Sequence, residues 1–435
     1  MVVMRKLPKR VRISFHTPGL THFGGLYLLQ GLVRQLGLPR LLVQAIRFRR
    51  WNTAYTVSEE LLAILYPILL GLGRLETARL LQQNSTFQYL TGLRRYPDAS
   101  TLRRFLTRFG QHGLAAFGRV HDRCRRRFLR GRRVIFDLDT TVLTVYGQQQ
   151  GAAVGFNPHK RGRRSFQPLL GFEGGSGICW EAQWLPGDAH PLSAATTLLD
   201  RAWGKLAASG RRVWVRADPA FQSEEFLAFL EGKRAVYAVA ARMSRGLQQR
   251  LGGLRYHPYG SGLEVAELGH RLSGWSRARR FVIVRRPVSE EPSRQLHLFT
   301  VGGYSYEAVV TNGPWQPLNV WKFYNGRATA ELVIRELKSG CAVGHIPRKD
   351  WAANEAYFHL VLFAYNLLLW FKQLYLPEPW KRINIQTLRN RLLWVPALLV
   401  WPQGRPTLRL PRSHPYQEQF LHVLRQIERR RVRLL

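Results

Sequence analysis

The period of apolar positions changes near residue 132 and divides the chain into a helical part and a mixed part. Before this point apolar residues recur every three or four positions, which is typical of one buried face of an α-helix. The pattern predicts mostly helical structure over residues 22–110. Helices are expected after the pair Gly24 and Gly25 and over 58–70 and 76–83, and Ser100 is expected to cap a fourth helix.

The fourth expected helix combines an apolar stripe with basic residues. Its apolar positions recur at helical spacing: Leu102, Phe105, Leu106 and Phe109. Arg103, Arg104 and Arg108 lie on its other faces, an arrangement that suits a DNA-facing helix. A basic surface helix without a ligand would have the same pattern, so the DNA interpretation depends mainly on the charge of the whole chain.

Beyond residue 132 apolar and polar residues alternate, which predicts β-strands. Strands are expected at 133–139, 166–172, 178–184, 213–217 and 235–241, with a helix at 192–206. Residues 243–312 form a β-rich block, with strands expected at 270–275, 280–284, 296–301 and 307–310. A long apolar helix (350–375) and a basic helix (415–431) follow. Strands interrupted by helices around one sheet indicate an α/β core.

Composition narrows the choice of partners. The formal net charge is +39 and the pI is about 11.3, and such self-repulsion favours a polyanionic partner. Nucleic acid is the expected polyanion, and an anionic membrane surface is the competing one. The length of 435 residues predicts two or three domains, and a hydrophobic content of 46% is enough to fill a large core.

Cysteine usage and the apolar runs bear on the compartment. Cys124, Cys179 and Cys341 are far apart, which argues against a disulfide framework and fits a reducing compartment. The N-terminus is basic and lacks the apolar stretch of a secretory signal. The longest apolar runs, 61–70 and 360–371, are too short for a bilayer span. We therefore expect no membrane association and a cytoplasmic protein.

Four residues in the last third of the chain form the most informative pattern: Tyr324, Arg327, Glu331 and Lys338. On one helix their directions would fall within about 60° of one another, as a narrow polar stripe. An acid between two cations on a rigid element suits binding of metal and phosphate together. A solvated charged face is the alternative interpretation, but the aromatic residue and the apolar helix that follows make solvent a less natural destination.

The spacing Y-(2)-R-(3)-E-(6)-K resembles the signature of insertion-sequence transposases of the DDE, RNase H-like superfamily. It is most similar to the branch with a β-rich insertion before the last catalytic Glu. The resemblance implies an α/β RNase H-like catalytic core with an inserted β-rich subdomain, preceded by an all-α N-terminal DNA-binding region. The expected boundaries are a basic arm (1–16), a helical DNA-binding region (17–130), the core (131–242 and 316–378), the insertion (243–315) and a basic C-terminal region (379–435).

Phosphodiester chemistry with Mg²⁺ requires hard oxygen ligands, and three acids are a sensible minimum. Asp139 ends a hydrophobic strand pattern, and Asp218 ends another. In the similar family an Asp in a D-x-T context is the first acid and an Asp in an R-x-D-x-x-F context is the second, and Glu331 would be the third. Asp137 faces the same side of its strand as Asp139 and stays an alternative. A strand-end Asp that merely caps a turn or helix is the structural alternative for Asp139 and Asp218.

Further roles follow from the resemblance alone. Arg327 and Lys338 would contact DNA phosphates beside the cleavage site, and Tyr324 would contact the terminal phosphate. Shorter stretches around 147–148, 168–170, 186–190 and 354–367 also resemble the family, with Gln167 in place of a usual His and Asp188 in place of a usual Asn. Tyr304, Tyr306 or Trp315 would be able to stack an extruded base, although packing is the preferred interpretation.

The resemblance implies a transposase that binds the terminal inverted repeats of an insertion sequence and catalyses strand cleavage and strand transfer. It implies Mg²⁺ or Mn²⁺ as the cofactor, as two ions, and double-stranded DNA of the element ends and target as the partner. A homodimer in the synaptic complex and a prokaryotic, nucleoid-associated location are also expected. Two other functions stay open: a catalytically inactive or domesticated DNA-binding protein, and an RNase H-like nuclease without strand transfer.

Overall fold

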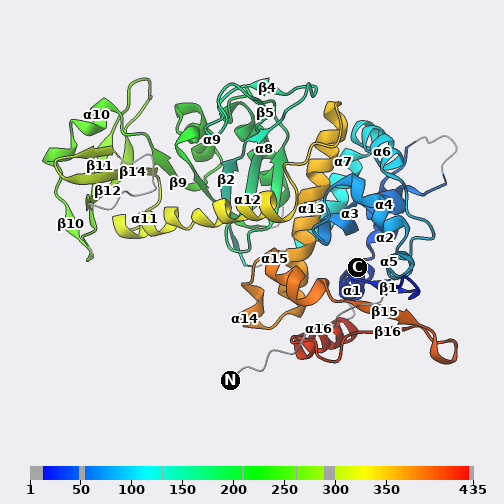
Figure 1. Ribbon diagram of the computed structural model, residues 1–435. Helices are drawn as coiled ribbons and strands as arrows, with labels where there is room; N and C mark the ends of the chain where they lie inside the picture. Colours follow the sequence, from blue (N-terminus) through cyan, green and yellow to red (C-terminus); the bar gives the residue numbers. More distant parts are fainter. Residues whose placement is uncertain are drawn as a thin grey trace.

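The computed structural model describes residues 13–48, 54–129, 131–207, 210–260, 262–288 and 299–430. The first twelve positions of the expected basic arm lie outside these ranges. The elements lie in three neighbouring regions, with a β-rich end, a central sheet and a helical end (Figure 1). Within the described residues no helix has the length and apolar character needed to cross a membrane.

The central sheet is built around β2 (Arg133–Thr140). This strand is parallel to β8 (Arg212–Ala217), which is parallel to β9 (Val236–Ala241). On its other side β2 is antiparallel to β6 (Leu169–Glu173), which pairs with β7 (Cys179–Gln183). The apolar face of β2 packs with α8 (Leu192–Ala207) and α9 (Glu224–Gly232) in one core. The mixed α/β class expected from the alternation is confirmed.

The β-rich block extends this sheet instead of forming a separate one. Strand β14 (Tyr304–Thr311) is antiparallel to β9, with Ala308 opposite Ala241 and Thr311 opposite Ala238. The other strands of the block continue outward from it: β12 (Arg279–Pro287), β11 (Glu264–His270), β10 (His257–Pro258) and the short β13 (Phe299–Val301). Helix α10 (Arg245–Gln248) precedes them.

Two expected strands differ from those observed. The strand expected at 270–275 is wrong, because β11 ends at His270 and Gly274 adopts a positive φ of 79° in the turn that follows. The strand expected at 166–172 is two strands, because Pro168 has no amide hydrogen with which to continue a ladder. Its first part is β5 (Arg164–Phe166), in a small sheet with β3 (Leu143–Thr144) and β4 (Ala153–Val154). Positions 296–298 of another expected strand lie outside the described residues.

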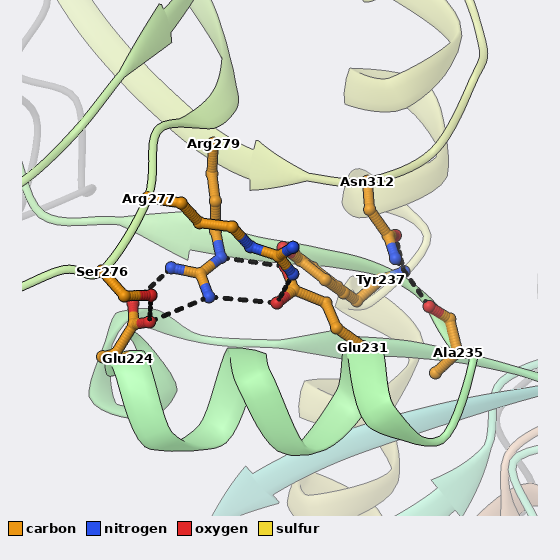
Figure 2. A network of polar contacts seen from close by, with 8 residues as sticks. All are labelled: Glu224, Glu231, Ala235, Tyr237, Ser276, Arg277, Arg279 and Asn312. Atoms are coloured by element: carbon orange, nitrogen blue, oxygen red, sulfur yellow. Dashed lines mark hydrogen bonds and ion pairs between the residues drawn. The ribbon is translucent and has the colours of Figure 1, made fainter.

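A polar network fastens the β-rich block to the central region (Figure 2). The buried guanidinium of Arg279 on β12 bonds to Glu224 and Glu231 on α9, with Nε 2.9 Å from Glu231 Oε1. These bonds lower the pKa of Glu224 to about 2, so this carboxylate stays charged at neutral pH. The Asn312 side chain donates to Ala235 O and accepts from Tyr237 N. The block is therefore joined to the core by side chains as well as by the β9–β14 ladder.

The helical end is assembled around α13 (Trp351–Tyr375), most of which is buried. The surrounding helices are α1 (Leu26–Gln35), α2 (Leu38–Ala45), α3 (Val57–Leu69), α4 (Ala78–Gln82), α5 (Ser85–Thr91), α6 (Ala99–His112) and α7 (Leu114–Arg125). The apolar stripe expected on α6 is buried. The cap expected at Ser100 is wrong, because Asp98 is the N-cap and accepts from Thr101 N at 2.7 Å, while Ser100 lies inside the helix.

The C-terminal region returns to the start of the described chain. Strand β15 (Ala397–Val400) pairs with β1 (Leu20–Thr21) on one side and with β16 (Thr407–Arg409) on the other. Helices α14 (Glu378–Lys381), α15 (Ile385–Leu388) and α16 (Gln417–Arg429) complete the region. Arg389 is fully buried and donates to Ile68 O and Leu69 O at the end of α3 and to Gly340 O at the end of α12 (Ala328–Gly340).

Candidate active site

Two of the expected acids lie at the ends of adjacent parallel strands. The register of β2 and β8 pairs Asp137 with Arg216 and Leu138 with Ala217. Asp139 and Asp218 are the next residues along the two strands, so the register brings them to the same edge of the sheet. Polar groups at the carboxyl ends of parallel strands commonly form ligand sites.

Asp137 and Asp139 have different partners, which separates the two alternatives for the first acid. Asp137 is completely buried and accepts two bonds from Arg216, at 2.6 Å from Nε and 2.7 Å from Nη2. Arg216 Nη1 also donates to Phe323 O at 2.8 Å. Asp137 is therefore held in an internal ion pair. Asp139 instead faces Arg327, whose Nη1 lies 3.0 Å from its Oδ2.

The residues expected on one helix lie on two consecutive helices. Tyr324 is on α11 (Pro317–Asn325), and Arg327 is the N-cap of α12, with a turn at Gly326 between them. The bond from Arg216 to Phe323 O explains the break: Arg327 N instead donates to Tyr324 O, three residues back, at 2.9 Å. A Cβ on Gly326 would also clash with the Arg216 guanidinium. The two helices follow each other along one side of the sheet (Figure 1).

Arg327 joins the first and third acids. Its Nη2 lies 2.7 Å from Glu331 Oε1, while its Nη1 bonds to Asp139. Only 11% of the Arg327 side chain is exposed, whereas 57% of the Glu331 side chain is exposed. Glu331 therefore lies at the solvent side of the site and Asp139 at its floor, with the guanidinium between them.

The pKa values reflect this crowding of acids. Burial raises the pKa of Asp139 to about 6, an effect that Arg327 opposes and that the charges of Asp218 and Glu331 increase. Burial also raises the pKa of Asp218, again against Arg327. Loss of the guanidinium without a replacement cation would push both pKa values further up. A positive charge beside Asp139 and Asp218 therefore favours their ionised forms.

A cavity of about 1020 Å³ opens over these residues. Its walls include the ends of β2, β8 and β9, the loop 187–191, Phe156 and Gln167, strands β13 and β14 of the β-rich block, and the helices α11 and α12. Asp218, Tyr324, Arg327 and Glu331 line it, and Asp139 lies beneath Arg327. Strands β13 and β14 thus provide a wall of the same cavity that Asp218 and Glu331 line.

The remaining residues expected at the site lie outside the lining of the cavity. Lys338 lies in the last turn of α12 outside the cavity lining, and burial lowers its pKa, an effect that the charge of Asp139 opposes. Arg103 on α6 is paired with Glu76, while Arg104 and Arg108 are exposed. Helix α6 packs against α13, so these three arginines belong to the helical end and are not part of the cavity.

The donor set has the chemistry of a divalent-cation site. Asp139 and Glu331 both bond to Arg327, which provides their compensating positive charge, and Asp218 lies near enough for its charge to act on Asp139. In the part of the chain that is described, however, no three His, Cys, Asp or Glu side chains are arranged closely enough to hold a metal ion. Asp139, Asp218 and Glu331 would be the ligands of such an ion if the guanidinium moved aside, since carboxylate oxygens suit Mg²⁺ and Mn²⁺.

The sequence did not predict the roles that two residues near the site have in the structure. Arg216 shapes the turn between α11 and α12, and the only signal was its place in the R-x-D context. Arg242, next to the end of β9, lines the cavity, and its charge opposes the rise that burial causes in the pKa of Asp218. No local pattern marked Arg242, because its proximity depends on the pairing of β8 with β9.

Comparisons with known proteins extend this description. The sequence matches the model of the family described as Transposase DDE domain group 1 over residues 4–432. No curated protein matches the sequence. Among solved structures, the chain is similar to one in the cryo-EM structure of the piggyBac transposase synaptic complex with hairpin DNA, with 12% identity and a TM-score of 0.45. That similarity covers 80% of this chain and 76% of the other. The family match spans all the elements that contribute to the cavity.

Proposed function

Because the chain belongs to the family of transposases with a group 1 DDE domain, we propose that it binds the terminal inverted repeats of an insertion sequence and catalyses metal-dependent strand cleavage and strand transfer. The observation that supports this proposal is the bonding of Asp139 and Glu331 to the same Arg327, with Asp218 at the end of the strand beside Asp139. Family membership makes the protein a transposase of a mobile element, and the roles of individual residues are part of the proposal.

We assign the catalytic core to an RNase H-like fold. The sheet order β7-β6-β2-β8-β9, with β6 antiparallel and β8 parallel to β2, supports this assignment. Residues 131–242 and 316–378 would form the core and 243–315 the insertion. Residues 17–130 would form a helical DNA-binding region, with the basic arm 1–16 before it and the basic region 379–435 at the other end.

Divalent ions held by the three acids would supply Lewis-acid stabilisation of the attacking and leaving oxygens. Arg327 and Lys338 would hold the scissile phosphate, since both lie on the helix that bears Glu331. Tyr324 would bound the phosphate position from the α11 side. Two element ends have to be brought together for strand transfer, so a homodimer would form the active complex.

The proposal is tested with duplexes that carry the inverted repeats flanking the coding region, incubated with the protein and a plasmid target. We expect 3′-OH ends and joined products in Mg²⁺ or Mn²⁺, and neither in EDTA. Cleavage without joining would instead identify a nuclease without strand transfer. Sequence-specific binding without either product would identify an inactive DNA-binding protein.

Lys338→Ala is expected to lower cleavage by about 10²-fold or more, because one fixed charge at a reacting phosphate contributes that much. End binding should fall only modestly, with the salt slope reduced by about one unit. Gel-shift titrations at several salt concentrations and single-turnover cleavage measure the two effects separately.

Arg104→Ala is the matched control, since it removes an exposed cation from α6, outside the cavity. It should weaken end binding and leave cleavage of the pre-bound complex unchanged. If Lys338→Ala cleaves at the wild-type rate and only lowers the melting temperature, the lysine has a structural role.

A further inference from the structure

The segment that leads from β3 into the first residue of β5 forms a basic loop beside the cavity. We call residues 146–164, which include β4, the β4 loop; it lies at the upper edge of the central region (Figure 1). No acidic residue occurs in the sequence between Asp139 and Glu173, whereas Lys160, Arg161, Arg163 and Arg164 fall within the loop. All four basic side chains are exposed.

The β4 loop is well anchored at its base. Asn157 is buried, donates from Nδ2 to Thr144 Oγ1 at 2.9 Å and accepts from Lys160 N at 3.0 Å. At the neighbouring turn, Gln150 N donates to Lys349 O at 2.8 Å and Gln150 Oε1 accepts from Trp351 N at 3.0 Å. These bonds fix the backbone on both sides of the exposed residues.

Three large apolar residues of this loop are exposed, namely Tyr146, Val154 and Phe156, and of these Phe156 is the one that lines the cavity. Its side chain is 71% exposed, although its neighbour Asn157 is buried. Phe156 lines the cavity together with Asp218 and Arg327. Gly155 packs so closely on Gly187 that a Cβ would clash with the Gly187 carbonyl, so the loop rests on the 187–191 wall. A large apolar ring is thus held in solvent at the mouth of the candidate active site.

The aromatics expected to stack bases are less available. Trp315 packs against Trp214, with ring centroids 4.7 Å apart, and Tyr306 is buried. The ring of Tyr304 is covered by the Arg285 guanidinium at 4.3 Å. Phe156 has no such ring or cation over it among the described residues.

The charges around Phe156 indicate what would cover it. Among the described residues no ion pair uses Lys160, Arg161, Arg163 or Arg164. Lys160 donates to the Tyr146 hydroxyl, whereas the charges of the three arginines are available to phosphates. A duplex presents phosphates but keeps its base faces stacked, whereas an unpaired nucleotide presents a base face next to its phosphate. A ring flanked by cations therefore matches an unpaired nucleotide better than an intact duplex.

We propose that the β4 loop binds an unpaired nucleotide of the DNA at the cavity mouth, with its base stacked on Phe156 and the adjoining phosphates on Arg161 and Arg163. This inference rests on the proposed function, because it assumes that the cavity receives a DNA end. It adds a recognition element, local strand opening, that lies outside the acids and the α11–α12 residues.

The test compares a blunt duplex with the same duplex carrying a short unpaired tail, by fluorescence anisotropy in EDTA. We expect the wild type to prefer the tailed DNA. Phe156→Ala should lose about 10-fold in affinity for tailed DNA and little for blunt DNA, in line with the contribution of one stacked base. Phe156→Trp should restore the preference. The double variant Arg161→Ala, Arg163→Ala should weaken both complexes and lower the salt slope by about two units.

Tyr259→Ala is the control, because it removes an exposed aromatic side chain near β10, at the end of the sheet. It should alter the affinity for neither duplex. Equal affinities of Phe156→Ala and wild type for tailed DNA, or an equal loss on both duplexes, would overturn the inference. If the wild type cleaves DNA and Phe156→Ala binds tailed DNA with wild-type affinity, this inference is wrong and the proposed function stands. Absence of metal-dependent wild-type cleavage defeats the proposed function, while the tail preference is still measured in EDTA.

Discussion

Asp218→Asn or Glu331→Gln is expected to reduce strand cleavage by about 10³-fold or more while end binding is retained. Each change removes the charge of one proposed metal ligand. The two carboxylates that remain cannot hold both ions in position. Binding should be equal or slightly tighter, because each change removes a negative charge that repels phosphate. Single-turnover cleavage in Mg²⁺ and gel-shift titration of the same duplex measure the two properties.

Asp188→Asn is the matched control, since it makes the same chemical change in the loop that borders the cavity. Asp188 takes no part in the bonds that join Asp139, Arg327 and Glu331. We expect this variant to cleave within a few fold of the wild type. Metal-dependent cleavage at near wild-type rates by Asp218→Asn or Glu331→Gln would rule out the three-acid mechanism.

The second large effect is expected on stability. Arg216→Met should lower the free energy of unfolding by about 3–5 kcal/mol, because it leaves the fully buried Asp137 charge without its partner. Asp137→Ala should cost a similar amount by leaving Arg216 unpaired. The double variant Asp137→Leu, Arg216→Met should recover part of the loss, since a buried ion pair is often replaceable by apolar residues. Chemical denaturation of the three variants measures these differences.

Lys233→Ala is the control for this series. Its pair with Asp200 is largely at the surface, and removal of such a pair costs about 0–1 kcal/mol. A loss near 1 kcal/mol in Arg216→Met would show that water reaches Asp137. That result would also reopen Asp137 as an alternative to Asp139 for the first acid.

Local patterns were enough for much of the fold and for the chemical types at the site. Alternation around residues 133–139 and 213–217 placed Asp139 and Asp218 at strand ends, and the observed register brings those ends together. The family expected from the spacing of Tyr324, Arg327, Glu331 and Lys338 is confirmed by the family match. These features depend on neighbours close in sequence, which a periodic pattern records.

The structure differs from the sequence-based predictions where contacts with distant residues determine the local structure. The break between α11 and α12 depends on a bond from Arg216, more than 100 residues earlier, to Phe323 O. The union of the β-rich block with the central sheet depends on which edge of β9 is available to β14. The β1–β15–β16 sheet joins segments almost 400 residues apart. No periodicity within a segment contains this information.

The ladder between β9 and β14 has a mechanical consequence. The wall formed by β14 and the floor formed by β2 and β8 belong to one hydrogen-bonded sheet, and Arg279 and Asn312 add further bonds across the junction. Moving this wall to widen the cavity would break several backbone hydrogen bonds at once, so the sheet fixes the width of the opening. A polymer threaded toward Asp218 must itself bend or open to fit, and the energy of that distortion depends on its own sequence.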